Sequence, residues 1–197
     1  MAAPLVLASS SPYKKMLLER LRIPFTCVSP NTDEQSKLNE KPEALALRLA
    51  QEKAMAVADA NPNSIIIGSD QVGELNGKIL GKPGNFEQAF RQLSAQSGET
   101  VYFHSAISVA RIQKNGEITH KTTVNTTTVD FKQLSSLQIE NYLKQDQPYN
   151  CAGSFKSEGL GISLFSSINT NDPSSLVGLP LIDLCKLLAM HGINIPK

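Results

Sequence analysis

The chain has 197 residues, 41% of them hydrophobic and 19% charged, and fits one α/β domain spanning residues 1–197. Its net charge of +1 excludes a global basic field aimed at nucleic acid or a membrane, although a few lysines could still form a local basic pocket. The three scattered cysteines form no CxxC pair, so the sequence supports neither a disulfide framework nor a zinc site. Because the sequence shows no signal segment and no 18-residue apolar run, we expect a cytoplasmic protein.

The first predicted strand is the apolar run at residues 5–8. The Ser-Ser-Ser-Pro segment 9–12 follows it and supplies an N-cap serine and a proline suited to the first turn of a helix that runs to about residue 22. A strand, a hydroxyl-rich turn and a helix N-terminus present free N–H groups to an anion. Lys14 and Lys15 oppose the helix dipole, which a bound phosphate would explain; the alternative is a capped surface helix with solvated lysines.

The next predicted elements are a strand at residues 25–28, a polar loop at 31–34 and a long helix from 42 to about 60. The loop ends in two carboxylates, for which a helix cap is the usual explanation. Lys53 lies beside the apolar face of the long helix, and a lone helix lysine normally faces solvent.

The centre of the chain is an unbroken β-branched run at residues 65–67, which suits a strand buried on both faces. The apolar character stops at Gly68, and Ser69, Asp70 and Gln71 follow at once. Ligands of open α/β sheets lie at the carboxyl ends of the strands, where an acid can hold a metal or take a proton from water. The alternative is that Asp70 makes a turn or caps a helix.

The rest of the chain continues the mixed pattern. Asn76-Gly77 between two apolar runs predicts a β-hairpin, and Pro83 leaves Lys82 displayed on the loop after it. The other predicted elements are a helix at 85–96, two long antiparallel strands at 100–112 and 117–131 around a turn at 114–116, a helix from 135 to about 144, a last strand at 162–165 and a final helix at 179–190.

Several segments resemble one family, the Maf-like nucleotide pyrophosphatases, whose fold is similar to that of the inosine-triphosphate pyrophosphatases. The matches come in family order and span most of the chain: LASSSP at 7–12, DE at 33–34, LAQEKA at 49–54, GSD at 68–70, GKP at 81–83, and AGSF at 152–155 continuing to EG at 158–159. The resemblance implies an α/β fold with a mixed, elongated central sheet flanked by helices.

The activity that the resemblance implies is metal-dependent hydrolysis of a nucleoside triphosphate between its α- and β-phosphates. The acid matched by Asp70 is the family's proton acceptor. The other matched site positions are Glu34, Lys53 and Lys82, with Ser9 and Ser11 in the turn that meets the phosphates.

The residue types suit this chemistry, because phosphoryl transfer needs positioning and charge neutralisation more than covalent help. Lys14, Lys53 and Lys82 could neutralise three phosphates. Asp70 and Glu34 could hold a divalent cation, Mg²⁺ or Mn²⁺, and orient water. Which of the two acids binds the metal directly is left open.

The chain departs from the usual family pattern after the Ser-Pro pair, where Tyr13 and Lys14 replace two arginines; lysine keeps the charge but loses the bidentate fork. An aromatic residue there, together with Gln71 and Glu158, resembles the subgroup that hydrolyses 7-methyl-GTP. N7-methylation makes guanine cationic, so Tyr13 could stack on it while Glu158 accepts the guanine N1–H and N2–H. The alternatives are helix packing for Tyr13 and a solvated loop acid for Glu158.

Two other functions stay open. One is a Maf-like pyrophosphatase for dTTP or UTP, which in the family goes with an arginine at position 13 and a glutamine at position 158. The other is a nucleotide-binding regulator of septum formation with little turnover, against which the complete set of site positions argues. The expected partner is a nucleoside triphosphate substrate, with no nucleic acid and no membrane, and the resemblance implies a homodimer.

Overall fold

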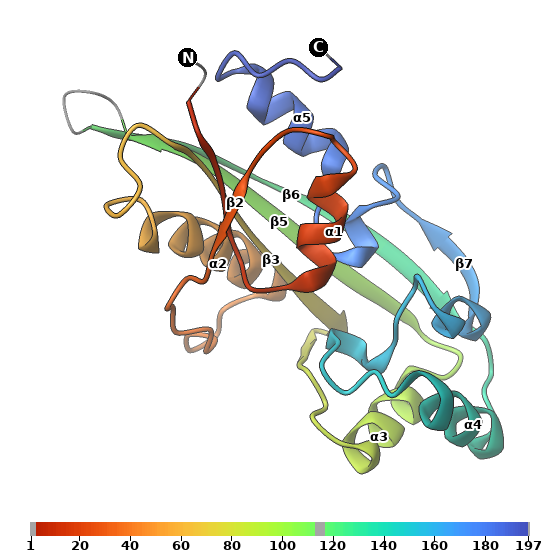
Figure 1. The fold of residues 1–197 in the computed structure, drawn as a ribbon. Coiled ribbons are helices and arrows are strands. Elements are labelled where there is room, and N and C mark those ends of the chain that lie inside the picture. The colour runs from red at the N-terminus through yellow and green to blue at the C-terminus, as the bar shows by residue number, and fades with distance from the viewer. Residues whose placement is uncertain (1–2, 113–116, 197) are drawn as a thin grey trace.

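The strands of the protein form a single mixed sheet. The computed structural model describes residues 3–112 and 117–196, and all seven described strands join in the order β2-β1-β3-β5-β6-β7, with β4 paired to β3 (Figure 1). β1 is parallel to β2 and β3, and the other pairs are antiparallel. The strands are β1 (Leu5–Ala8), β2 (Thr26–Val28), β3 (Ile65–Leu75), β4 (Lys78–Leu80), β5 (Thr100–Ile112), β6 (Ile118–Phe131) and β7 (Phe165–Asn169).

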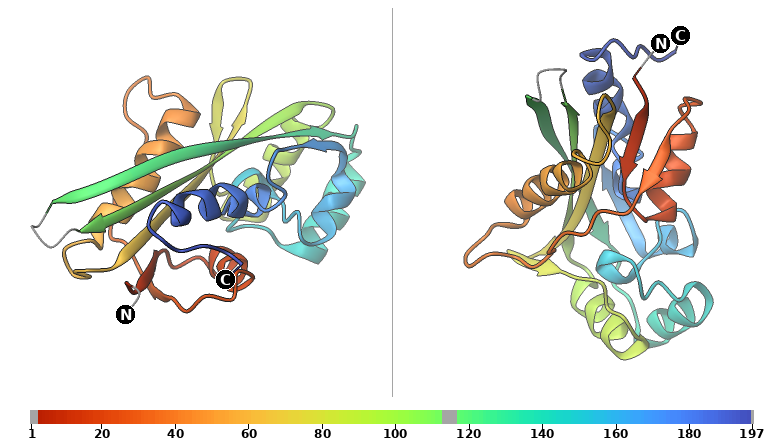
Figure 2. Two further views of the ribbon diagram at one scale, coloured as in Figure 1. Left: turned by 90° about the horizontal axis from the view of Figure 1, so that it is seen from above. Right: turned by 60° about the vertical axis from the view of Figure 1, so that its left-hand side comes forward.

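Helices cover both faces of this sheet, which confirms the predicted mixed α/β fold class. α2 lies on one face, α1 and α5 lie on the other, and α3 and α4 pack at the far end of the long strands (Figures 1 and 2). No described helix is both long and apolar enough to cross a membrane. The helices are α1 (Pro12–Glu19), α2 (Pro42–Ala56), α3 (Phe86–Gln96), α4 (Ser136–Asp146) and α5 (Leu181–Ala189), with 3₁₀ turns η1 (Ala152–Ser154), η2 (Leu160–Leu164) and η3 (Ser175–Val177).

The β-branched run at the start of β3 is buried on both faces, as predicted. Ile65 and Ile67 pack into the core with α1 and α5, whereas Ile66 packs with the C-terminal part of α2. All three side chains are at most 1% exposed. Successive residues of a strand point to opposite faces, so the same alternation decides where the polar residues that follow will point.

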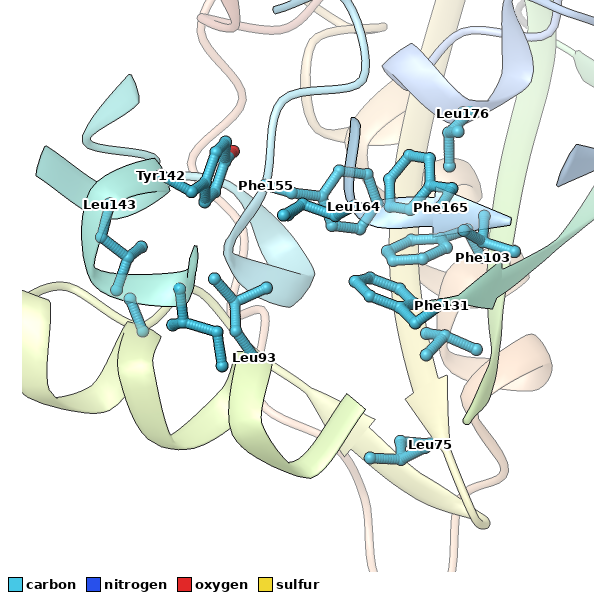
Figure 3. Packing of buried hydrophobic residues seen from close by; sticks show 14 residues of the cluster. Leu75, Leu93, Phe103, Phe131, Tyr142, Leu143, Phe155, Leu164, Phe165 and Leu176 are labelled. Carbon is cyan, nitrogen blue, oxygen red and sulfur yellow. The ribbon is translucent and has the colours of Figure 1, made fainter. Parts of the chain in front are cut away.

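A second core joins α3 and α4 to the end of the sheet. Phe155 makes edge-to-face contacts with Phe103, Phe131 and Phe165 at ring-centre distances of 5.1, 5.8 and 4.8 Å (Figure 3). Leu93 of α3 belongs to the same buried cluster. These contacts fix the 152–155 segment against the sheet, which matters because this segment leads into Glu158.

β3 is longer than the sequence indicates, and the prediction that it stops before Asp70 is wrong. β5 pairs with β3 from Ile65 to Glu74, and this pairing carries the strand through its polar residues. On the other edge, β1 pairs only as far as Gly68 and β4 begins only at Gly73. Residues 69–72 therefore have no described strand beside them on that edge, and Asp70 lies within a strand rather than in a turn or cap.

The remaining element predictions are mostly confirmed. The β3–β4 hairpin turns at Asn76 and Gly77 with φ values of 50° and 76°, and β5 and β6 are antiparallel, although their predicted turn lies outside the described residues. The predicted strand at 162–165 is wrong: the chain forms η2 there, and β7 begins at Phe165. Gly161 lies against the backbone of Lys156, where an added Cβ would be 2.4 Å from the carbonyl oxygen, and this close turn replaces an extended strand.

The approach of α2 to β3 is set by Gly68. A Cβ at this position would lie 2.1 Å from the carbonyl oxygen of Ala50 and 2.6 Å from the amide nitrogen of Ala54. Only a residue without a side chain allows the helix backbone this close to the strand. Lys53, in the same turn of α2, is thereby brought to the face of the sheet on which Asp70 points.

We expect Gly68→Ala to lower the free energy of unfolding by about 3 kcal/mol, because the new methyl group overlaps helix backbone that cannot move aside as a flexible side chain would. Chemical denaturation measures the change. Gly81→Ala is the matched control, since a Cβ there would meet nothing within 4 Å. Equal stability of the two variants would contradict this account of the packing.

Candidate active site

A cleft of about 740 Å³ opens at the free edge of β3, a volume in the usual range for small-molecule sites. Its walls come from the serine-rich turn, the β3 edge, the loop after β4, the segment before and after η1, and η3. Every residue predicted from the sequence to belong to the site lines it: Ser9, Ser11, Tyr13, Lys14, Glu34, Lys53, Asp70, Gln71, Lys82 and Glu158.

The serine-rich turn forms one wall and opens α1 as predicted. The Oγ of Ser11 caps the helix by accepting from the amide of Lys14 at 3.4 Å. The Oγ of Ser9, which is buried, accepts from the amide of Ser11 at 3.1 Å. The first turn of α1 contains no acidic residue, so its positive end faces the cleft without a neutralising carboxylate of its own.

Lys14 crosses from α1 to the free edge of β3. Its Nζ donates to the carbonyl oxygen of Ser69 at 2.6 Å, which satisfies a strand carbonyl beyond the end of β1. Burial lowers the pKa of Lys14 to about 8, an effect that Asp70 opposes and Lys53 reinforces. Lys15 instead faces solvent and pairs with Glu19 at 3.8 Å, so the two neighbouring lysines have different surroundings.

The centre of the site is an ammonium held between two carboxylates. The Nζ of Lys53 lies 2.6 Å from Oδ1 of Asp70 and 2.5 Å from Oε1 of Glu34. Lys53 and Asp70 are 7% and 8% exposed, so Lys53 does not face solvent as a lone helix lysine normally does. The reason is the close approach of α2 to β3, which buries this part of the helix.

Lys53 and Glu34 stabilise each other's charged forms, and Asp70 also stabilises the charged form of Lys53. Burial alone would lower the pKa of Lys53, but the charge of Asp70 and the hydrogen bonds to both acids raise it above the usual lysine value. Partial burial works against ionisation of Glu34, yet the hydrogen bond and the charge of Lys53 lower its pKa. The charge of Lys82, exposed on the loop after β4, further lowers the pKa of Glu34 and of Lys14, and Lys82 is the third cation that lines the cleft.

The cleft also has an aromatic and an acidic side chain in its lining, Tyr13 and Glu158. Tyr13 lines the cleft, and its hydroxyl lies 4.0 Å from Sγ of Cys151. Burial raises the pKa of Tyr13 to about 12, with Cys151 and Glu158 contributing, so its hydroxyl stays protonated near neutral pH. Glu158 is exposed at the rim, where the Oγ of Ser157 donates to its carboxylate at 3.4 Å.

The polar residues of β3 divide between the two faces of the sheet. Gln71 directs its amide nitrogen at η3, where the carbonyl oxygens of Ser175 and Leu176 and the Oγ of Ser105 each lie 3.0 Å away. Ser69 Oγ donates to the carbonyl of Gly178 at 3.1 Å on the same side. Gln71 thus lines the cleft and also holds its wall, and a contact of Gln71 with a substrate stays a prediction.

Several residues that line the cleft were not singled out from the sequence. They are Ser10, which lies within the matched segment 7–12, Asn150, Cys151, the η3 residues Leu176 and Val177, and Gly178 after η3. Cys151 directly precedes the AGSF segment, which was the one local signal for it. The η3 wall has no such signal, because bonds to residues about a hundred positions earlier in the chain hold it in place.

In the described part of the chain, the site that could hold a metal ion is formed by two acids, Asp70 and Glu34. No group of three or more His, Cys, Asp or Glu side chains suited to a metal occurs among the described residues. Asp70 and Glu34 converge from β3 and from the loop before α2 onto one ammonium. Two carboxylates without a third protein ligand can hold a hard cation only when a ligand and water complete the oxygen set.

Comparison with known proteins places the chain among close relatives. The model of the family described as Maf-like protein matches residues 4–191. A protein of Colwellia psychrerythraea and one of Methylobacillus flagellatus, both named 7-methyl-GTP pyrophosphatase, are 51% and 50% identical over 97% and 98% of this chain and 94% and 98% of theirs. A solved nucleoside-triphosphatase/dITP/XTP pyrophosphatase of Mycobacterium abscessus is 17% identical, with a TM-score of 0.43 over 95% of each chain.

The lowered pKa of Lys14 predicts that anion binding weakens as the pH rises. About nine-tenths of a lysine with a pKa near 8 is charged at pH 7 and about one-tenth at pH 9. Affinity for tripolyphosphate, measured by calorimetry, should therefore fall between pH 7 and 9. Lys14→Arg is the control, because arginine stays charged throughout and the titration of the anion itself is the same for both proteins. An equal fall in both proteins would show that Lys14 is not responsible.

Proposed function

The chain belongs to the family of Maf-like proteins, and on that premise we propose that it is a nucleotide pyrophosphatase that converts 7-methyl-GTP to 7-methyl-GMP and pyrophosphate. The observation that carries the proposal is the set of side chains that line the cleft. It combines the cations of Lys14, Lys53 and Lys82 with the aromatic ring of Tyr13 and the carboxylate of Glu158. A nucleotide with an anionic tail and a cationic base matches both kinds of group.

The reaction that suits this arrangement is attack by water on the α-phosphorus. The water oxygen bonds to that phosphorus, the bond to the oxygen bridging the β-phosphate breaks, and pyrophosphate leaves with the electron pair. Asp70 accepts the proton from the water, oriented by Lys53 at 2.6 Å. The three lysines neutralise the charge that develops on the leaving group, which is where catalysis of phosphoryl transfer has most to contribute.

A divalent cation is part of the proposal, and the residues present fit it. Asp70 and Glu34 offer hard oxygen donors, and each uses one carboxylate oxygen to meet Lys53, so the other oxygen could bind a cation. Mg²⁺ in nucleotide enzymes is typically bound by one or two carboxylates plus substrate phosphates and water. Such an ion would neutralise phosphate charge and help to orient the attacking water. Its identity, Mg²⁺ or Mn²⁺, stays a prediction, as do the homodimer and the cytoplasmic location.

The preference for a methylated purine would come from Tyr13 and Glu158, which both line the cleft. A cationic base stacked on the Tyr13 ring gains cation–π energy that a neutral base does not. Glu158 can accept the N1–H and N2–H of guanine, a donor pair that pyrimidines lack. Tyr13 belongs to none of the buried hydrophobic clusters among the described residues, which favours a ligand-facing role over helix packing.

Asp70→Asn should lower kcat for pyrophosphate release at least ~10²-fold while the protein stays folded, because the amide cannot accept the proton. Glu74→Gln is the matched control: it removes a carboxylate from the same strand, but this one pairs with His104 at 2.8 Å and lies outside the cleft. Near wild-type turnover by folded Asp70→Asn would exclude Asp70 as the base. If the wild-type protein hydrolysed no nucleoside triphosphate with Mg²⁺ or Mn²⁺, the alternative of a nucleotide-binding regulator would be favoured.

Selectivity is tested by a turnover panel of 7-methyl-GTP, GTP, dTTP, UTP and CTP. The wild-type protein should prefer 7-methyl-GTP, with stacking worth about 0.5–2 kcal/mol and the Glu158 contacts about 1.5–3 kcal/mol. Tyr13→Arg combined with Glu158→Gln should erode this preference and admit dTTP or UTP. Tyr102→Arg, on an exposed residue outside the cleft, is the control. Faster wild-type turnover of dTTP or UTP would favour the pyrimidine alternative.

A further inference from the structure

A second charged side chain of α2 reaches toward the loop that carries Glu34. The Nε and Nη2 of Arg48 lie 2.7 and 2.8 Å from the two carboxylate oxygens of Glu40, a bidentate pair. The same Nη2 donates to the carbonyl oxygen of Gln35 at 2.9 Å. Arg48 therefore binds the loop at its C-terminal end and also at the residue that follows Glu34.

This ion pair is well shielded from water. The side chains of Arg48 and Glu40 are 17% and 10% exposed, unlike a surface pair that solvent screens. The hydrogen bonds from Arg48 and from the amide of Lys37 lower the pKa of Glu40 to about 2, so the pair stays charged over the working range of pH. A bidentate, charge-assisted pair of this kind fixes orientation as well as distance.

The loop has little else to hold it in one conformation. Residues 29–37 form no regular secondary structure, and Leu38 is 94% exposed, so the loop does not bury its one large apolar side chain. Its own bonds are short-range: the amide of Gln35 donates to Asp33, and that of Lys37 to Glu40. Apart from the pair between Glu34 and Lys53, the bonds of Arg48 connect this segment to α2.

We propose that Arg48 is a positioning residue that holds the loop at residues 31–41 so that Glu34 meets Lys53. Arg48 and Glu40 do not line the cleft, so Arg48 would act through Glu34 and not on the substrate. α2 carries both Arg48 and Lys53, and the helix thus holds the loop in register with the lysine that Glu34 must meet. This inference rests on the proposed function, which gives Glu34 its role.

The test is a double-mutant cycle on the turnover of 7-methyl-GTP. Arg48→Met should lower kcat about tenfold in the wild-type background, which corresponds to a typical coupling energy between residues that share a partner. When Glu34→Gln is already present, the same substitution should lower kcat less than about twofold. Glu40→Gln should behave like Arg48→Met, and Arg48→Lys should recover part of the loss. Glu52→Gln is the control, because Glu52 also pairs with Arg48, at 2.9 Å, but belongs to α2 and not to the loop.

Hydrogen exchange provides a measurement that does not depend on turnover. Amides of residues 31–40 should exchange faster in Arg48→Met and Glu40→Gln than in wild type or Glu52→Gln, with exchange in β3 unchanged. Equal losses of kcat in both backgrounds, or unchanged exchange in this segment, would overturn the positioning role. If the wild-type protein released no pyrophosphate while the variants showed the predicted changes in exchange, the proposed function would be overturned and the anchoring of the loop would stand.

Discussion

The contact on which the rest of the site depends is that between α2 and β3 at Gly68. The helix backbone lies where a side chain on the strand would otherwise be, and Lys53 is consequently buried beside Asp70. A buried ammonium and a buried carboxylate would each be costly alone, and they are stable here because each satisfies the other. The spacing of two backbones thus determines the geometry of a charged pair.

The cleft exists because β3 has different partners along its length. β5 pairs with β3 from Ile65 to Glu74, whereas β1 and β4 each cover only part of the opposite edge, so residues 69–72 have no described strand beside them there. The polar groups of residues 69–71 form hydrogen bonds with several other elements. Lys14 binds the carbonyl of Ser69, Gln71 holds η3, and Asp70 meets α2. The alternation of a strand distributes these contacts between the two faces.

The residues that line the cleft depend on different parts of the fold. Lys14, Lys53 and Asp70 belong to α1, α2 and β3, which pack through the cores on either face of the sheet. Glu158 depends on the second core, where Phe155 anchors the segment that leads to it. The loop bound by Arg48 adds Glu34 to the lining. A ligand in the cleft therefore contacts segments that pack into separate cores.

Local rules in the sequence determined much of this protein. Helix caps at Ser11, Asn85 and Ser135 begin helices in the structure, and the Asn76-Gly77 pair makes the expected hairpin, because these signals act over a few residues. The resemblance to the family, together with the departures from its pattern at Tyr13 and Lys14, pointed to ten residues that all line one cleft. The likeness of separate segments to family motifs, and not any contact, selected them.

Only the tertiary structure decided how those residues meet. β3 runs through Asp70 because β5 pairs with it, Lys53 is buried because Gly68 admits α2, and Gln71 faces η3 because Ser175, a hundred positions later, returns to the sheet. Each of these contacts joins segments that are distant in sequence. Periodicity and capping report the preferences of neighbouring residues, and they contain no information about which distant backbone will fill the space beside a strand.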